Sequence, residues 1–179
     1  MANLIAVDKS GDVLPQYQKT PVSDLLEFHN LGREFEPFDK ARLLIGMCID
    51  NRKQLRLPGN FAFIIRTGGA NLRYSEFKIS YCIAIGGVKC VVLIAHSLCG
   101  MVNVFSQKDL FVNGLVEHAG WSHEQATDHF MSYAPMFQIG NEIDFILSET
   151  RRLCSRYPNI LIAPLFYRTE ENRLYQIAE

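Results

Sequence analysis

The stretch Cys48-Ile49-Asp50-Asn51-Arg52 directly follows an apolar run at residues 41–47. This run is too short for a typical helix, and its composition is typical of an interior strand of a parallel sheet. A thiol, an acid and a base therefore stand together where a buried strand ends. Because ligand sites collect at the carboxyl ends of parallel strands, we expect this stretch to belong to a functional site.

A second polar stretch, His96-Ser97-Leu98-Cys99, follows another apolar run at residues 90–95. Zinc is commonly bound by cysteine sulfur and histidine nitrogen in a tetrahedron, and catalytic zinc sites keep the fourth position open. Cys48, His96 and Cys99 would supply three such ligands if the two strands are neighbours. A single buried cysteine is usually a small core residue rather than a ligand, so this interpretation depends on the three residues together.

The order of the elements predicts an α/β fold with a mainly parallel central sheet flanked by helices. Strands are expected at residues 41–47, 61–65, 90–95, 160–166 and 174–177, and a helix is expected at residues 75–86. A strand, a helix and a strand at this spacing imply a right-handed crossover between parallel strands.

The remaining segments are mostly helical. A capping-box pattern at residues 122–125 starts a helix that we expect Pro135 to interrupt. Asn141 is a suitable N-cap for a further long helix. The N-terminal part consists of a loose arm at residues 1–20 and a helix at residues 21–36. This helix either lies at the periphery of its own protomer or reaches over a partner subunit.

Length and charge exclude several classes of protein. At 179 residues the chain is most simply one domain, residues 1–179, with one core. The net charge of −1 and the lack of a basic run give no reason to expect nucleic acid or an anionic membrane as a partner. No apolar stretch approaches the ~20 residues that span a bilayer, and residues 1–12 lack a signal-peptide pattern. We therefore expect a cytoplasmic protein.

The cysteines indicate metal binding rather than disulfides. The chain has five, an odd number without a framework pattern, which is typical of reduced thiols. Cys82, Cys90 and Cys154 stand in apolar surroundings, so we expect them in the core.

Taken together, these motifs resemble the β-class carbonic anhydrases. The resemblance is carried by Cys-x-Asp-x-Arg after one buried strand, Arg-x-Gly-Gly at residues 66–69, and His-x-x-Cys-Gly after another strand. It covers residues 41–104 well, and the rest of the chain only in its pattern of helices and a late strand.

The resemblance implies a lyase that hydrates carbon dioxide reversibly to bicarbonate, with zinc hydroxide as the nucleophile. Cys48, His96 and Cys99 match the Zn2+ ligands, and Asp50 and Arg52 match the acid–base dyad that positions the hydroxide. The family is known in open and closed forms, the closed form arising when Arg52 releases Asp50 to occupy the fourth position on zinc. A homodimer or a higher homo-oligomer, with sites near the subunit interface, is also implied.

Three positions depart from the usual family pattern: Leu57, Thr67 and Leu98 each make the site less polar or alter its hydrogen bonds. We place Leu57 in the substrate pocket together with Gly68 and Gly69, whose backbone amides can approach the substrate. A plain tight turn is the alternative for the two glycines. A less polar pocket would suit carbonyl sulfide or carbon disulfide, which relatives of the family hydrolyse. The third interpretation is a catalytically silent relative that binds zinc together with bicarbonate or a protein partner.

Overall fold

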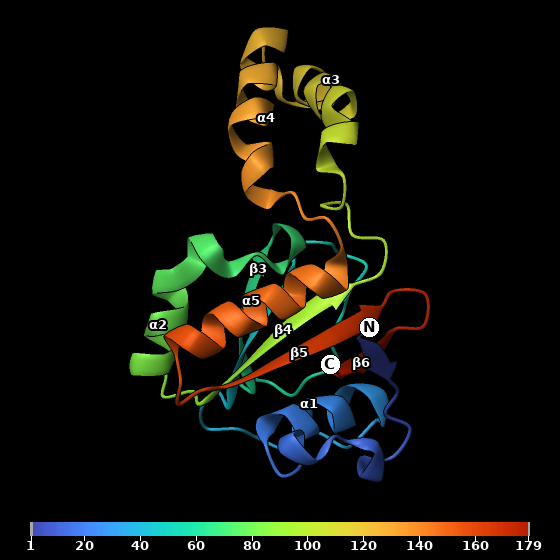
Figure 1. Cartoon of the computed structure of the whole chain (residues 1–179), viewed down its shortest axis with the longest axis vertical. Coiled ribbons are helices and arrows are strands. Elements are labelled where there is room, and N and C mark those ends of the chain that lie inside the picture. The colour runs from blue at the N-terminus through green and yellow to red at the C-terminus, as the bar shows by residue number, and fades with distance from the viewer. Residues whose placement is uncertain (1, 179) are drawn as a thin grey trace.

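One six-stranded sheet with the order β1-β6-β5-β4-β2-β3 organises the computed structural model, which describes residues 2–178 (Figure 1). The strands are β1 (Asn3–Ile5), β2 (Leu43–Cys48), β3 (Ala62–Thr67), β4 (Cys90–His96), β5 (Leu161–Arg168) and β6 (Arg173–Ala178). The four strands from β2 to β5 are parallel to one another, and β6 and β1 continue the sheet as antiparallel strands. The predicted α/β fold with a mainly parallel sheet is therefore confirmed.

Helices cover both faces of the sheet, which is why its central strands are apolar throughout. The helix α1 (Pro21–Asn30) packs on one face, and α2 (Glu76–Ala84) and α5 (Glu142–Arg156) pack on the other. Asn141 caps α5 as predicted, because its side chain accepts the first backbone N–H groups of the helix. Short 3-10 turns lie at Ser10–Asp12, Pro15–Tyr17, Gly68–Ala70, Leu72–Ser75 and Val104–Gln107.

Strand β2 shows how the sheet directs side chains to its two faces. Leu43, Ile45 and Met47 join the core beneath α1, whereas Leu44 joins the core beneath α2 and α5. This alternation with a period of two fixes the face on which each residue of the strand lies. Within residues 2–178, no helix combines the length and the apolar character needed to cross a membrane.

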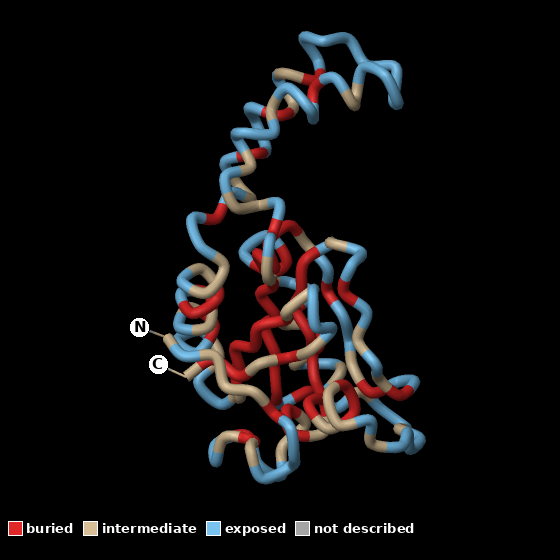
Figure 2. Tube along the Cα trace, turned by 90° about the vertical axis from the view of Figure 1, so that its right-hand side faces the viewer, coloured by how far each residue is buried: buried red, intermediate tan, exposed pale blue. Residues whose placement is uncertain are grey.

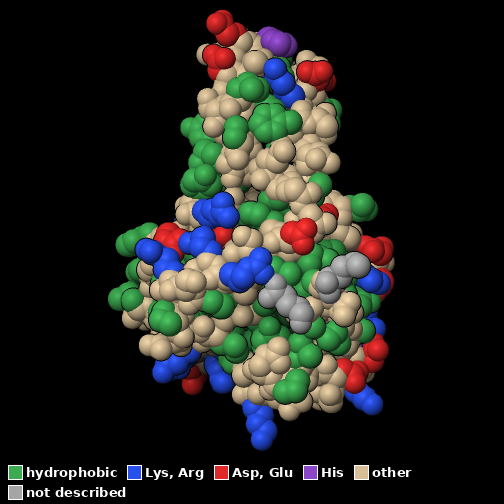
Figure 3. All heavy atoms as spheres, in the orientation of Figure 1, with side chains coloured by type: hydrophobic (Ala, Val, Ile, Leu, Met, Phe, Trp, Pro, Cys, Tyr) green, Lys and Arg blue, Asp and Glu red, His purple; other side chains and the backbone are tan. Residues whose placement is uncertain are grey.

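A helical hairpin, formed by α3 (Lys108–Ala119) and α4 (His123–Phe137), projects from the sheet domain (Figures 1 and 2). Apolar side chains lie along this projection in the space-filling view (Figure 3). The predicted capping box at the start of α4 is present. The predicted interruption at Pro135 is wrong, because α4 continues to Phe137. Pro135 and Met131 are both exposed, so water can replace the helical hydrogen bond that proline removes.

The N-terminal segment packs on the domain, so the expectation of a loose arm is wrong. Strand β1 pairs with β6, and three spaced apolar side chains enter the core beneath α1: Val7, Val13 and Tyr17. The fully buried Gln176 bonds the backbone of residues 12 and 14. The exposed residues between these apolar positions hid the pattern in the sequence. Helix α1 ends at Asn30, earlier than predicted, and covers the sheet of its own protomer.

We predict that Gly46→Ala lowers the free energy of unfolding by about 1–3 kcal/mol, because β2 leaves no room for a side chain there. A Cβ at Gly46 would lie 2.6 Å from Cδ1 of Leu72 and 3.1 Å from Cδ2 of Leu93. Urea denaturation measures the effect. Gly11→Ala is the matched control, since no atom lies within 4 Å of the added Cβ. Equal destabilisation by the two substitutions would contradict this packing.

Candidate metal centre

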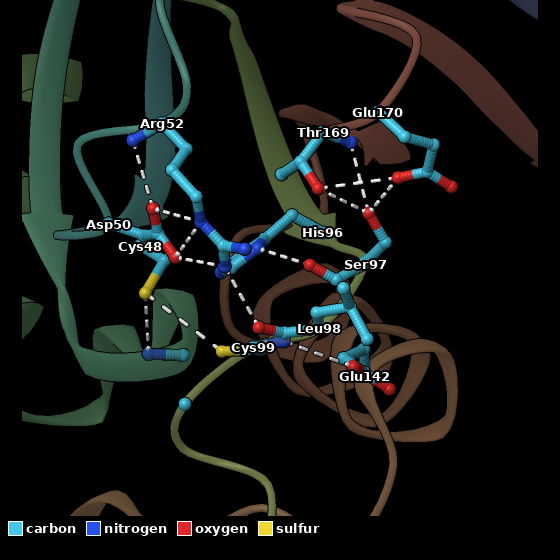
Figure 4. Close-up of polar contacts among 12 residues, drawn as sticks. Cys48, Asp50, Arg52, His96, Ser97, Leu98, Cys99, Glu142, Thr169 and Glu170 are labelled. Atoms are coloured by element: carbon cyan, nitrogen blue, oxygen red, sulfur yellow. Dashed lines mark hydrogen bonds and ion pairs between the residues drawn. The ribbon is translucent and has the colours of Figure 1, made fainter.

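Cys48, His96 and Cys99 meet where the neighbouring parallel strands β2 and β4 end (Figure 4). Their ligand atoms all lie within 4.8 Å of one another, and the two sulfur atoms are 4.0 Å apart. All three side chains are buried. The structure therefore brings together the three residues that the sequence singled out, although they come from separate segments.

This group of donor atoms fits a zinc ion. Two sulfurs at ~2.3 Å from zinc in a tetrahedron lie about 3.8 Å apart, close to the spacing observed. Nδ1 of His96 is hydrogen-bonded to the carbonyl of Ser97 at 2.9 Å. Nε2 of His96 is buried and has no hydrogen-bond partner among the described residues. A ring nitrogen in this state is available to a metal, and the bond at the other nitrogen fixes the ring orientation.

The turn between His96 and Cys99 is held by the neighbouring β5–β6 connection. The N–H of Ser97 donates to the carbonyl of Tyr167 at 3.1 Å. The hydroxyl of Ser97 donates to Glu170 at 2.7 Å and accepts the N–H of Thr169 at 3.0 Å. Leu98 then adopts a left-handed conformation with φ +55°, which turns the chain sharply before Cys99. The ligand geometry thus depends on a strained backbone that the next strand connection supports.

Hydrogen bonds favour the thiolate form of Cys48. The pKa of this thiol is lowered because Cys99 donates a hydrogen bond to it and backbone N–H groups add to the effect, although burial opposes it. One of those donors is Gly69, whose N–H lies 3.4 Å from Sγ of Cys48. The pKa of Cys99 is raised because it is the donor in this pair and is buried. The two shifts run in opposite directions, so the pair favours one sulfur as acceptor and the other as donor.

The two glycines predicted to face the substrate are packed tightly. Gly69 has φ +63° and donates to the sulfur of Cys48. A Cβ on Gly68 would lie 3.0 Å from Sδ of Met101 and 3.1 Å from the ring of Phe137. Close packing and a tight turn explain both glycines, and their contact with substrate stays a prediction.

Asp50 and Arg52 form an ion pair beside this centre. Nε of Arg52 lies 3.0 and 3.1 Å from the two carboxylate oxygens, and Nη2 lies 2.6 Å from Oδ2. The guanidinium holds the pKa of Asp50 well below its usual range, although partial burial opposes this. Nη2 also donates to the carbonyl of Leu98 at 2.9 Å, so Arg52 connects the two strand-end loops. The carboxylate is therefore ionised and held in the arrangement where Arg52 retains it.

Arg66 and Glu142, to which the sequence assigned no role, support the two loops that carry the candidate ligands Cys48 and Cys99. Arg66 donates to the backbone carbonyls of Cys48, Asp50 and Lys53 at 3.1–3.3 Å. The Arg-x-Gly-Gly motif contained Arg66 but did not indicate which atoms it binds. Glu142, at the start of α5, accepts the N–H of Cys99 at 3.3 Å, and nothing near it in the sequence signalled this contact.

Leu57 lies in a different environment from the metal centre. Its partly buried side chain packs against the core beneath α1. Cys48 and Cys99 belong to a separate cluster with Ile139. Among the described residues, Leu57 and the two cysteines therefore belong to different clusters, and the place of Leu57 in the substrate pocket stays a prediction.

The other cysteines lie away from the centre. Cys82 and Cys90 are buried as predicted, and burial raises the pKa of Cys90 to about 12. The prediction for Cys154 is wrong, because this residue is exposed. Its neighbour Leu153 occupies the buried face of α5, and one helical residue further turns the side chain about 100° away.

The chain resembles known proteins in its structure rather than in its sequence. No protein-family model matches the chain, and no curated protein matches its sequence. A carbonic anhydrase from Glaciozyma antarctica has a TM-score of 0.62 and 17% identity, with 92% of this chain and 99% of that chain covered. A β-carbonic anhydrase from Trichomonas vaginalis has a TM-score of 0.62 and 16% identity, with 87% and 93% covered.

A carbon disulfide hydrolase is also similar in structure, with a TM-score of 0.53, 18% identity, and 76% of this chain and 78% of that chain covered. Identities at this level establish the fold and not the reaction. The chain therefore has the fold of the β-class carbonic anhydrases, as the sequence motifs predicted.

We predict that the purified protein contains about one zinc ion per chain, and that Cys48→Ser and Cys99→Ser each lose most of it, because three protein ligands are the usual number in catalytic zinc sites. Elemental analysis by mass spectrometry measures the ratio. Cys154→Ser is the matched control, since it removes an exposed thiol away from the centre. Well-folded wild-type protein without any transition metal would contradict the assignment.

Proposed function

We propose that this chain is a zinc-dependent carbonic anhydrase that hydrates carbon dioxide reversibly to bicarbonate and a proton. The observation that carries the proposal is the buried Nε2 of His96, which has no partner among residues 2–178 and lies beside two thiols and a bidentate Asp50–Arg52 pair. The fold shared with β-class carbonic anhydrases supports it. Cys48, His96 and Cys99 would hold the ion, which when bound supplies a water acidic enough to provide a nucleophile near neutral pH.

In this proposal Asp50 orients the nucleophile. Its carboxylate is ionised, so it can accept a hydrogen bond but cannot donate one. The guanidinium of Arg52 donates to both carboxylate oxygens, and the backbone N–H of Arg52 donates to Oδ1 at 2.9 Å, so the nucleophile would share one of these oxygens with Arg52. Because Arg52 also holds the carbonyl of Leu98, Asp50 keeps a fixed position relative to the loop that carries Cys99. Orientation of this kind removes the need for solvent to reorganise during the reaction.

The proton released in hydration passes to buffer in this proposal. The described histidines other than His96 lie on other elements: His29 on α1, His118 on α3, and His123 and His129 on α4. None of them belongs to the group formed by Cys48, His96 and Cys99.

We predict that Asp50→Asn lowers kcat/KM for carbon dioxide hydration by about 10²-fold, since it removes a charged acceptor from the reacting water. Stopped-flow measurement with a pH indicator gives the rate, and elemental analysis confirms that the variant keeps its zinc. Asp39→Asn, at an exposed position, is the matched control for the loss of one carboxylate. A zinc-loaded Asp50→Asn protein with unchanged activity would exclude the proposed role of Asp50.

Hydrolysis of carbonyl sulfide or carbon disulfide is the second candidate function. Two large apolar side chains, Ile49 and Leu98, belong to the two loops of the candidate centre and are 59% and 76% exposed. The fold is also that of a carbon disulfide hydrolase. Release of hydrogen sulfide without carbon dioxide hydration would favour this reaction. A folded, zinc-loaded protein with neither activity would identify a catalytically silent zinc-binding relative.

We further propose a homodimer or a larger homo-oligomer in the cytoplasm. Ile49 and Leu98 stand exposed on loops of the candidate centre, where a second subunit would cover them. All five cysteines are unpaired, which suits a reducing compartment. Light scattering coupled to size-exclusion chromatography measures the assembly, and a monomer at micromolar concentration would contradict the oligomer.

A further inference from the structure

Lys53 is fully buried, and its ammonium nitrogen has no hydrogen-bond partner among the described residues. Lysine is almost never fully buried unless it is paired. An unpaired buried charge is costly, so the ammonium form of Lys53 depends on negative groups nearby. Lys53 follows the dyad immediately, one residue after Arg52.

The backbone around Lys53 is folded back towards the metal centre. Arg66 donates from Nη1 to the carbonyl of Cys48 at 3.2 Å and to that of Asp50 at 3.3 Å. The same guanidinium donates from Nη2 to the carbonyl of Lys53 at 3.1 Å. One side chain therefore gathers the segment from Cys48 to Lys53 into a tight loop, which keeps Lys53 beside the centre.

The negative groups that act on Lys53 are those of the centre. Burial lowers the pKa of Lys53, and Cys48, Asp50 and Cys99 oppose this by raising it. Asp50 is already paired with Arg52 at 2.6 Å. Cys48, whose thiolate form is favoured, is therefore the main partner left for the charge of Lys53, and it acts on it through space.

The formal charges of the centre show what Lys53 adds. Two thiolates neutralise a divalent cation, His96 as a ligand is neutral, and Asp50 is neutralised by Arg52. A protonated Lys53 would then leave the loaded centre with one positive charge. In a buried site of low dielectric such a charge attracts an anion strongly, whereas it acts weakly on a neutral molecule.

We propose that Lys53 is an electrostatic specificity residue that raises the affinity of the centre for anions, bicarbonate among them, without contacting them. The inference rests on the proposed function and extends it, because it names a residue that favours binding of bicarbonate, the product of hydration. Because the side chain of Lys53 is fully buried within one protomer, a partner subunit cannot reach the nitrogen to supply a counter-ion. The competing interpretation is that the aliphatic stem of Lys53 only fills space in the core.

Lys53→Met separates these two interpretations, since methionine retains an apolar stem and removes the charge. We expect Lys53→Met to raise KM for bicarbonate in the dehydration direction about tenfold and to leave KM for carbon dioxide within twofold of wild type. Lys78→Met on α2 is the matched control, because it removes the same charge from an exposed position. Equal changes in the two KM values, or no change in either, would overturn the proposal.

A binding measurement keeps the test independent of the proposed reaction. Thiocyanate is titrated into the cobalt-substituted protein, and the visible spectrum of the metal reports binding even if the protein hydrates no carbon dioxide. We expect the dissociation constant for thiocyanate to rise about tenfold in Lys53→Met and to stay unchanged in Lys78→Met. Equal affinity in all three proteins would overturn the role of Lys53, whatever the activity assay shows.

Lys53→Gln provides a second neutral side chain if methionine disturbs folding, and thermal denaturation reports the fold of each variant. Weakened thiocyanate binding in a folded Lys53→Gln protein supports the proposal. If neither neutral variant folds, the charge serves the fold itself and the proposed specificity role is overturned.

Discussion

The parallel pairing of β2 with β4 is the constraint on which the candidate centre depends. Their register places Gly46 opposite Leu93 and Met47 opposite Ile94, so that both strands end at the same edge of the sheet. Side chains alternate between faces, and Met47 points to the core beneath α1 while Cys48 joins the cluster of the centre. A slip of one residue would exchange these two side chains and leave a thioether in place of a thiol.

Arginine side chains fix the loops that the strands leave free. The segment after Cys48 has no regular hydrogen-bonding pattern of its own, so its shape depends on bonds from outside it. Arg66 binds its carbonyl groups from β3, and Arg52 binds the carbonyl of Leu98 in the second ligand loop. Charged donors form stronger hydrogen bonds than neutral donors, and a guanidinium group presents several N–H donors in a fixed geometry. The Asp50–Arg52 pair and the two loops that carry Cys48 and Cys99 are therefore one connected unit.

Much of this arrangement was predictable from sequence, because buried parallel strands appear as apolar runs and ligands follow their ends. The parts that were not predictable depend on tertiary contacts. Val7, Val13 and Tyr17 are too widely spaced to indicate a packed segment, and their burial depends on a sheet formed by the other end of the chain. Helix α4 continues past Pro135 because this residue is exposed, so water can replace the backbone hydrogen bond that proline removes. Nothing in the local sequence shows that Lys53 is buried, since lysine is ordinarily exposed.

Leu98 indicates that the protomer alone does not account for the surface around the centre. A left-handed conformation costs a residue with a side chain roughly 1–2 kcal/mol, and glycine would avoid most of this cost. The side chain of Leu98 is 76% exposed, so packing within the protomer offsets little of it. Ile49, on the other ligand loop, is exposed as well. Two large apolar groups on the two loops of the candidate centre gain stability only when another surface excludes water from them. Association between subunits would supply that surface and would also exclude water from the space next to Asp50.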